Sequence, residues 1–472
     1  MRAVLFKGSR DLIPLYALYA LLFADHGLNT AQISSLLALW SLTAFVLEVP
    51  SGAWADTVSR RALLILSGLL MLAGFCTWTL APTYLGFAIG FILWGVAGAL
   101  ESGTFEALVY DDLVALDESA AYSRIMGYTR AAQESTVVLA ILAAAPLYGW
   151  GGYALVGWSS VAVSALHCLI ALTLPRAPMA VSAAAVEDLD DDALADDVDG
   201  YPQCPPDGRR AVRTEQARAA RAGLRRGDPV PGAAVPDGDT AAGPDSSAQP
   251  YVTVTVAAPD VARQGPFARY RAMLVTGVGE AIRVRRVRNG VLLGALLYGV
   301  TAYDEYFGLL AQEAGASTTV VPLLVGVTVF GSLIGSLLAG RTEAMRAWIM
   351  AAALTVSGVL FIAGSLAAGA ASHRPDMLYL LTGLGFSAIG IAYGIVFNAE
   401  VVAGARLQDA IEGPARATVT SVSGLLSEVV ALAVFGFVAL VTTWLTMAIT
   451  MALLGAAMLA IAAVTPAWLP RR

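Results

Sequence analysis

The stretch Gly52-Ala53-Trp54-Ala55-Asp56-Thr57-Val58-Ser59-Arg60-Arg61 lies between two long apolar runs. It holds one acid and two arginines, whereas the runs on either side are long enough to cross a bilayer, which takes about 20 apolar residues. A charged stretch this short cannot form a domain of its own. It is therefore expected to be a tight turn between two membrane-spanning helices.

The composition extends this interpretation to the whole chain. Apolar residues make up 57% of the 472 residues and charged residues only 14%, against about 25% charged residues in soluble domains. Apolar runs recur from end to end and are continuous, whereas the strands of a membrane β-barrel would alternate. The sequence predicts an all-α polytopic membrane protein.

Turn residues divide these runs into about twelve predicted spans. Their approximate cores are 11–27, 31–50, 62–81, 84–108, 126–148, 153–174, 289–312, 319–340, 345–369, 376–402, 417–440 and 443–467. Arginine and lysine concentrate in alternate turns, beginning with Arg2, Lys7 and Arg10 ahead of the first span. By the positive-inside rule both termini are expected in the cytoplasm, with the protein in the inner membrane.

Residues 176–265 differ from the rest. An acidic block, a basic patch and a tract rich in proline and glycine follow one another, and such a segment cannot bury enough apolar surface to offset its ordering entropy. We expect a disordered cytoplasmic linker. Residues 266–288 have the pattern of a basic amphipathic helix on the membrane surface. The linker and this helix separate a six-helix bundle over 1–175 from a second bundle over 289–472.

The two bundles resemble each other in sequence. Gly27-Leu28-Asn29-Thr30 and Gly315-Ala316-Ser317-Thr318 precede corresponding spans, and the same ungapped offset carries Gly52 onto Gly340. Two parallel bundles joined by a loop are the design of a parallel-repeat transporter. The offset carries Asp56 onto Ala344, so the charged turn occurs only in the first half.

Span number, linker, duplication and the spacing Gly-x3-Asp-x3-Arg-Arg together resemble the major facilitator superfamily across the chain outside the linker. The resemblance implies two six-helix bundles and secondary transport by alternating access. The turn departs from the family pattern at Thr57 and Ser59. The fourth span also lacks the arginine of many proton-coupled members, and only a fragment of the antiporter motif follows Ala145.

The resemblance also implies a gate on the cytoplasmic side. Asp56 would meet the start of the eleventh span, where a helix N-terminus favours a carboxylate. Arg60 and Arg61 would bind inner acids when that side is closed. The residues assigned to this gate are Gly52, Asp56, Arg60 and Arg61, with Glu48, Asp111 and Asp112 as further elements.

Ionisable residues deep in the spans are expensive and are functional candidates by default. Arg130 and Glu134 are spaced i,i+4 in the fifth span, so they can pair on one helix face near the membrane midplane. This pair either lines the cavity or only fixes the rotation of the helix. Glu428 lies at mid-depth in the eleventh span, where desolvation favours its protonated form. It is a candidate for proton coupling, or a protonated side chain bonded to a neighbouring helix.

Three further groups are candidates for the cavity. Asp304 and Glu305 lie in the outer part of the seventh span, and adjacent residues on a helix point about 100° apart. They either attract cations or form a solvated outer gate. Glu101 lies in the inner part of the fourth span. Tyr16 and Tyr19 share a face of the first span, as cavity aromatics or as packing residues.

These observations favour transport over catalysis. No histidine or cysteine has a companion at metal-ligand spacing, and no glycine-rich phosphate loop precedes a helix. We expect a monomeric secondary transporter without a cofactor, nucleic-acid partner or enzymatic activity. We expect proton-coupled efflux of a small organic molecule. Import of a nutrient is the close alternative, and a transporter-like sensor is a third.

Overall fold

Long apolar helices dominate the computed structural model, which describes residues 1–55, 58–177, 284–411 and 416–470. Helices are the elements expected here, because a spanning helix satisfies its own backbone hydrogen bonds in lipid. The predicted linker and most of the amphipathic helix lie outside the described residues. Arg285, Arg286 and Arg288 form the first turn of α11, continuous with the seventh span.

The described elements follow a simple order. The first half contains α1 (Arg2–Arg10), η1 (Pro14–Ala17), α2 (Tyr19–Asp25), α3 (Thr30–Ala55), α4 (Arg60–Leu80), α5 (Tyr84–Glu101), α6 (Thr104–Ala115), η2 (Ser119–Ala121) and α7 (Tyr122–Ala171). The second half contains α11 (Arg285–Val300), η4 (Thr301–Tyr306), α12 (Phe307–Glu313), α13 (Val321–Thr342), α14 (Ala347–Ala371), η5 (Pro375–Met377), α15 (Leu378–Ala410), α16 (Arg416–Val441) and α17 (Met447–Trp468).

Within the described ranges, nine helices are long and apolar enough to cross a membrane. The sequence predicts about twelve spans, and the difference has two causes. The first and seventh spans are each broken by a 3₁₀ segment, so neither forms one long α-helix. In addition, α7 joins the fifth and sixth spans through a kink at Gly151 and Gly152, whose backbone angles are not helical.

Two predicted spans differ in detail from the helices. Helix α1 lies ahead of the predicted start of the first span at residue 11, and it contains Lys7 and Arg10. Their side chains are only 13% and 20% exposed, so they do not lie in a solvated turn. The apolar segment of the fourth span runs from Tyr84 to Ala115, and α5 ends within it at Glu101, because Gly103 adopts a left-handed conformation (φ 67°) before α6 begins.

The internal repeat extends from sequence to structure. The offset that carries Gly27 onto Gly315 also carries α2 onto α12, and it places η1 within η4. Both of these glycines have positive φ, at 87° and 96°, which a residue with a side chain rarely adopts. The two halves therefore break their first helices at the same place and turn in the same way.

Close packing within the second half depends on glycine. A Cβ on Gly335 would overlap the carbonyl group of Gly394, and one on Gly331 would overlap that of Gly390. Small residues at such crossings allow helix backbones to approach closely in a membrane. Helices α13 and α15 are thereby locked together over two turns.

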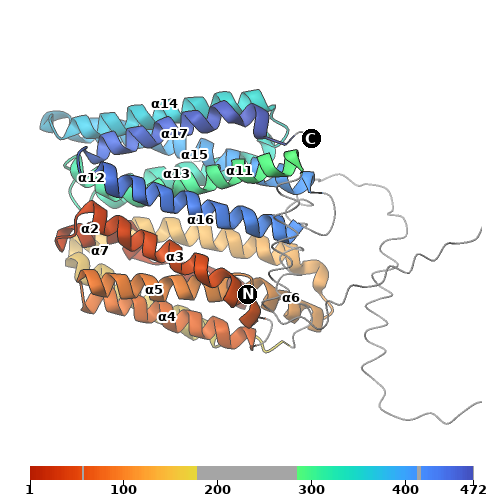
Figure 1. Cartoon of the computed structure of the whole chain (residues 1–472). Coiled ribbons are helices and arrows are strands. Elements are labelled where there is room, and N and C mark those ends of the chain that lie inside the picture. The colour runs from red at the N-terminus through yellow and green to blue at the C-terminus, as the bar shows by residue number, and fades with distance from the viewer. Residues whose placement is uncertain (56–57, 178–283, 412–415, 471–472) are drawn as a thin grey trace, which may run out of the picture. The chain divides into compact units, whose positions relative to one another are not determined.

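The two halves meet chiefly where α3 packs on α16, α7 on α13, and α2 on α12, and η1 also contacts α13. Figure 1 shows α3 and α16 side by side. We call the end that holds the Gly27 and Gly315 turns the Asp25 end, and the opposite end, where α4 begins, the Arg60 end.

Candidate functional site

The acids of the broken seventh span point in different directions. Adjacent residues of a 3₁₀ helix are separated by about 120°. Asp304 accepts a hydrogen bond from the hydroxyl of Tyr393 on α15, inside the second half. Glu305 accepts one from the hydroxyl of Tyr19 on α2, in the first half. Glu305 is thus the acid that faces the interface between the halves.

A second hydrogen bond crosses the interface next to Glu305. The hydroxyl of Tyr306 lies 2.7 Å from that of Ser34 on α3, and both side chains are buried. This pair is not predicted from the sequence. No local signal identifies it, because a serine in one half and a tyrosine in the other are paired only by the way the halves pack.

Glu428 lies at the same interface, further from the Asp25 end. Its carboxylate accepts a hydrogen bond from the hydroxyl of Ser41 on α3, and Ser41 is only 3% exposed. The sequence interpretation left open whether Glu428 couples protons or bonds to a neighbouring helix. The structure supplies the helix neighbour, and this neighbour belongs to the other half.

The expected pairing of Arg130 with Glu134 is wrong. Both side chains are exposed, and no ion pair joins them in the described part of the chain. Arg130 lies within electrostatic range of Glu400 of α15, across the interface, but no ion pair joins these two residues in the described structure either. Helical spacing allowed a pair with Glu134, but the packed structure does not form it. Glu400 was missed because it lies near the predicted end of its span.

Glu101 lies in a buried charged cluster of the first half. Glu101 is 2% exposed. Its carboxylate forms ion pairs with Nε of Arg10 at 2.6 Å and with Nζ of Lys7 at 2.9 Å. Lys7 also lies 3.5 Å from Glu106, and Arg10 lies 4.0 Å from Asp11. The sequence places both cations ahead of the first span, so it does not predict that they neutralise Glu101.

Tyr16 belongs to the same region. Its hydroxyl donates to Asp11 at 3.2 Å, and Asp11 also accepts from the amide of Gln133 at 2.6 Å. The ring of Tyr16 stacks on the ring of Trp94, with 5.2 Å between the ring centroids. The rings of Tyr16 and Tyr19 both pack on the aromatic residues of α4 and α5, as a shared face requires. Their hydroxyls diverge, one toward Asp11 and the other toward Glu305.

His167 is fully buried beside this cluster. Its Nδ1 lies 2.9 Å from the hydroxyl of Ser9, and its ring lies 4.4 Å from that of Phe6. Its Nε2 has no hydrogen-bond partner in the described structure. No group of three or more metal-ligating side chains occurs among the described residues.

At the Arg60 end, one arginine connects three helices. Arg60 donates to the carboxylate of Asp111 at 2.6 Å and to the carbonyl of Ala107 at 3.1 Å, both on α6, and to the carbonyl of Ala55 on α3 at 3.2 Å. Arg60 is 2% exposed and Asp111 is 0% exposed. The predicted pairing of Arg60 with an inner acid is confirmed, and the acid is Asp111.

The other residues of the predicted gate contribute less to this arrangement. Arg61 donates to the carbonyl of Leu172 at the end of α7. Asp112 is partly exposed and is influenced by the charge of Arg2. A Cβ on Gly52 would have open space around it. Asp56 and the side chain of Glu48 lie outside the described residues, so their predicted roles stay predictions.

Comparisons with known proteins agree with this architecture. The sequence profile described as Major Facilitator Superfamily matches residues 8–430. Among solved structures, the chain resembles a point mutant of the nucleoside transporter NupG (TM-score 0.60, 12% identity, 98% of this chain and 97% of that chain). It also resembles a D-xylose-proton symporter (TM-score 0.56, 15% identity, 99% and 96%). A comparison with curated protein sequences found no match.

The fold and its interface define a polytopic membrane transporter built from two parallel halves. The chain belongs to the Major Facilitator Superfamily, since the family profile spans most of its length. The structural neighbours are less than 25% identical to it, so they support the shared fold and leave the substrate unassigned.

Proposed function

We propose that this protein moves a small polar organic molecule across the cytoplasmic membrane by alternating access, with proton coupling. The observation that carries the proposal is a pair of acids at the interface of the halves. Glu305 and Glu428 of the second half each accept a hydrogen bond from a hydroxyl of the first half, Tyr19 and Ser41. These hydrogen bonds break when the halves separate, so the hydrogen bonding of each acid depends on which side of the transporter is open.

Proton coupling is expected because such an acid loses its hydrogen-bond donor while it remains in an apolar environment. A carboxylate that loses a hydroxyl donor in an apolar interior is destabilised relative to its protonated form. Movement of the halves and uptake of a proton are then linked, because each step changes the free energy of the other. Glu134 is the weaker candidate, since it is exposed and has no described partner across the interface.

The direction of transport is better assigned to import than to the efflux that the sequence suggested. The efflux argument rested on an excess of buried acids, which would attract cations. Lys7 and Arg10 neutralise Glu101, so the excess is smaller than the sequence indicated. Two of the structural neighbours are named as a nucleoside transporter and a D-xylose-proton symporter, and these names favour import.

The cluster around Arg60 is proposed as the gate at its end of the molecule. Arg60 binds the end of α3 to α6 through Ala55 and Asp111, and Asp56 lies between α3 and α4 in the sequence. The arginine distribution favours a cytoplasmic location for this end. The gate would be present in the first half only, as the sequence offset suggests.

Transport in proteoliposomes tests the coupling. With labelled uridine and D-xylose as probes, an inward proton gradient should raise accumulation by the wild-type protein. Glu428→Gln should abolish the response to the gradient while leaving exchange of internal for external probe. Glu134→Gln serves as the matched control and should respond as the wild type does. Accumulation by Glu428→Gln that still follows the gradient would remove this acid from the coupling, and gradient-independent flux in the wild type would exclude proton coupling altogether.

A further inference from the structure

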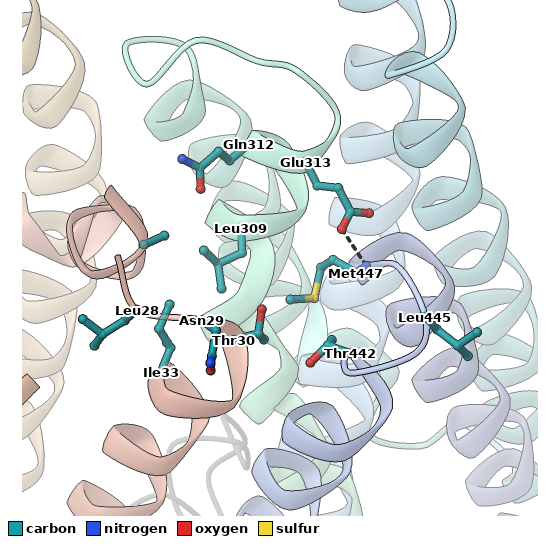
Figure 2. A pocket seen from close by; sticks show the side chains of 11 residues that line it. Leu28, Asn29, Thr30, Ile33, Leu309, Gln312, Glu313, Thr442, Leu445 and Met447 are labelled. Carbon is teal, nitrogen blue, oxygen red and sulfur yellow. Dashed lines mark hydrogen bonds between the residues drawn. The ribbon is translucent and has the colours of Figure 1, made fainter. Parts of the chain in front are cut away.

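A pocket of about 410 Å³ lies between the two halves at the Asp25 end (Figure 2). Asn29, Thr30 and Ile33 line it from the first half, and Gln312, Glu313 and Thr442 line it from the second. Its volume falls in the range of about 300–1,000 Å³ that is typical of small-molecule sites. Glu305 and Glu428 are not among its lining residues, so it is separate from the proposed coupling site.

Two amides in the lining are held in fixed orientations. Nε2 of Gln312 donates to Asp25 at 3.0 Å, which leaves the amide oxygen of Gln312 as an acceptor. Oδ1 of Asn29 accepts from the backbone of Gln32 at 2.9 Å, which leaves the amide NH₂ of Asn29 as a donor. Neither remaining group bonds to a residue that the structure describes. One donor and one acceptor, on lining residues from opposite halves, thus remain available to a ligand.

The pocket is close to neutral. Glu313 is its only charged lining residue, and its two carboxylate oxygens accept the backbone N–H groups of Met447 and Ala448 at 2.7 and 3.1 Å. These groups belong to the N-terminus of α17, whose partial positive charge compensates the carboxylate. A ligand therefore meets hydrogen-bonding groups rather than an uncompensated charge, with Ile33 and Leu309 as its apolar contacts.

The geometry points to a second ligand site for a neutral, hydroxyl-bearing molecule of sugar or nucleoside size. A hydroxyl group donates and accepts, so it matches both fixed amides, while the carbon skeleton covers the apolar side chains. The site is complete only while the Asp25 end is closed, because opening would draw its two walls apart. A molecule bound there stabilises the closed state by mass action and slows opening at this end.

Binding to the purified full-length protein in lipid nanodiscs tests the site. Uridine and D-xylose are the neutral probes, and choline and benzoate are charged controls. We expect at least one neutral probe to raise the melting temperature with increasing concentration and the charged controls to have no effect. Thr442→Trp should fill the pocket and remove this rise. Thr443→Trp is the matched control, because Thr443 is the exposed neighbour in sequence and does not line the pocket.

Further variants keep the test decisive. Thr30→Trp fills the pocket from the first half and should act as Thr442→Trp does, which covers the case in which one variant fails to fold. Asp25→Ala should raise the required probe concentration about tenfold, since Asp25 orients Gln312 and also bonds to Tyr153 at 2.6 Å. Asp25 does not line the pocket itself.

The possible results separate this site from the transport path. A rise that Tyr19→Phe removes and Thr442→Trp retains would come from the interface around Glu305 and would overturn the proposal. Absence of any rise with both neutral probes would overturn it as well. Failure of transport in proteoliposomes would count against the proposed function alone. A rise in melting temperature that depends on Thr442 and Thr30 would still support a ligand site in this pocket.

Discussion

Arg60 illustrates how a single side chain can be anticipated in part from the sequence. The resemblance of its turn to the family pattern, together with the acids just beyond the fourth span, implies an ion pair near the membrane surface. The structure places the guanidinium between two helices with almost no exposure, and it adds two carbonyl acceptors to the ion pair. The additional bonds could not be predicted, because backbone acceptors leave no trace in the residue types.

Removal of Arg60 should be strongly destabilising. In Arg60→Ala, Asp111 would lose its charged partner while remaining buried, and breaking a buried pair from one side costs about 3–5 kcal/mol. Thermal unfolding of the purified protein measures this loss. Arg124→Ala is the control, because Arg124 is exposed, and it should change stability little. Equal melting temperatures for the two variants would show that the Arg60 pair contributes no more than a surface charge.

Lys7 and Arg10 show the opposite case, in which residue type misled the interpretation. Charged residues at the start of a chain were expected to be in water. The structure places both cations in α1, where they are mostly buried and meet Glu101. Their partner lies on another helix, far away in sequence.

At the scale of elements, the breaks in the first and seventh helices are the features that hydropathy does not reveal. Both spans are apolar on average although they contain charged residues, and a sliding average does not distinguish a 3₁₀ segment from an α-helix. The break at η4 turns Asp304 and Glu305 toward different neighbours. The functional orientation of these acids depends on the local helix type, which is set by packing against the rest of the bundle.

Glycine contacts between α13 and α15 give a prediction at this scale. Gly335→Ala would place a methyl group against the backbone of Gly394 and force the helices apart, at a cost of about 1–3 kcal/mol for overpacking. Gly340→Ala on the same helix has open space around the new Cβ. It should be neutral or slightly stabilising, because alanine favours helices by about 0.5–1 kcal/mol over glycine. Melting temperatures of the two variants should move in opposite directions or differ clearly. Equal values would contradict the close contact.

For the whole molecule, the contacts between halves carry the functional argument. Tyr19 with Glu305, Ser34 with Tyr306, and Ser41 with Glu428 all join a residue of the first half to one of the second. The pocket at the Asp25 end also takes lining from both halves. A movement of the halves would alter all of these contacts at once, which is why alternating access can couple them.

A wedge between α2 and α12 should therefore block the transport cycle without unfolding the protein. A Cβ on Gly308 would lie 2.8 Å from the side chain of Leu21 in the other half. Gly308→Trp should prevent closure at the Asp25 end and reduce transport by at least about tenfold, the factor that corresponds to about 1.4 kcal/mol. Gly383→Trp is the control, since a Cβ there meets nothing within 4 Å. Both variants should elute as folded protein in size-exclusion chromatography. A wild-type transport rate in Gly308→Trp would show that this contact does not close during the cycle.

The sequence by itself determined the helical membrane fold, the duplication and the turn with its Arg60 pair. These features depend on local hydropathy, on short spacings and on similarity between the halves, all of which can be counted along one chain. Only the tertiary structure decided which hydroxyl meets which acid, how Glu101 is neutralised and where the pocket lies. Each of these depends on the rotation and depth of helices that are distant in sequence. That geometry is set by the packing of the whole bundle, and no single segment encodes it.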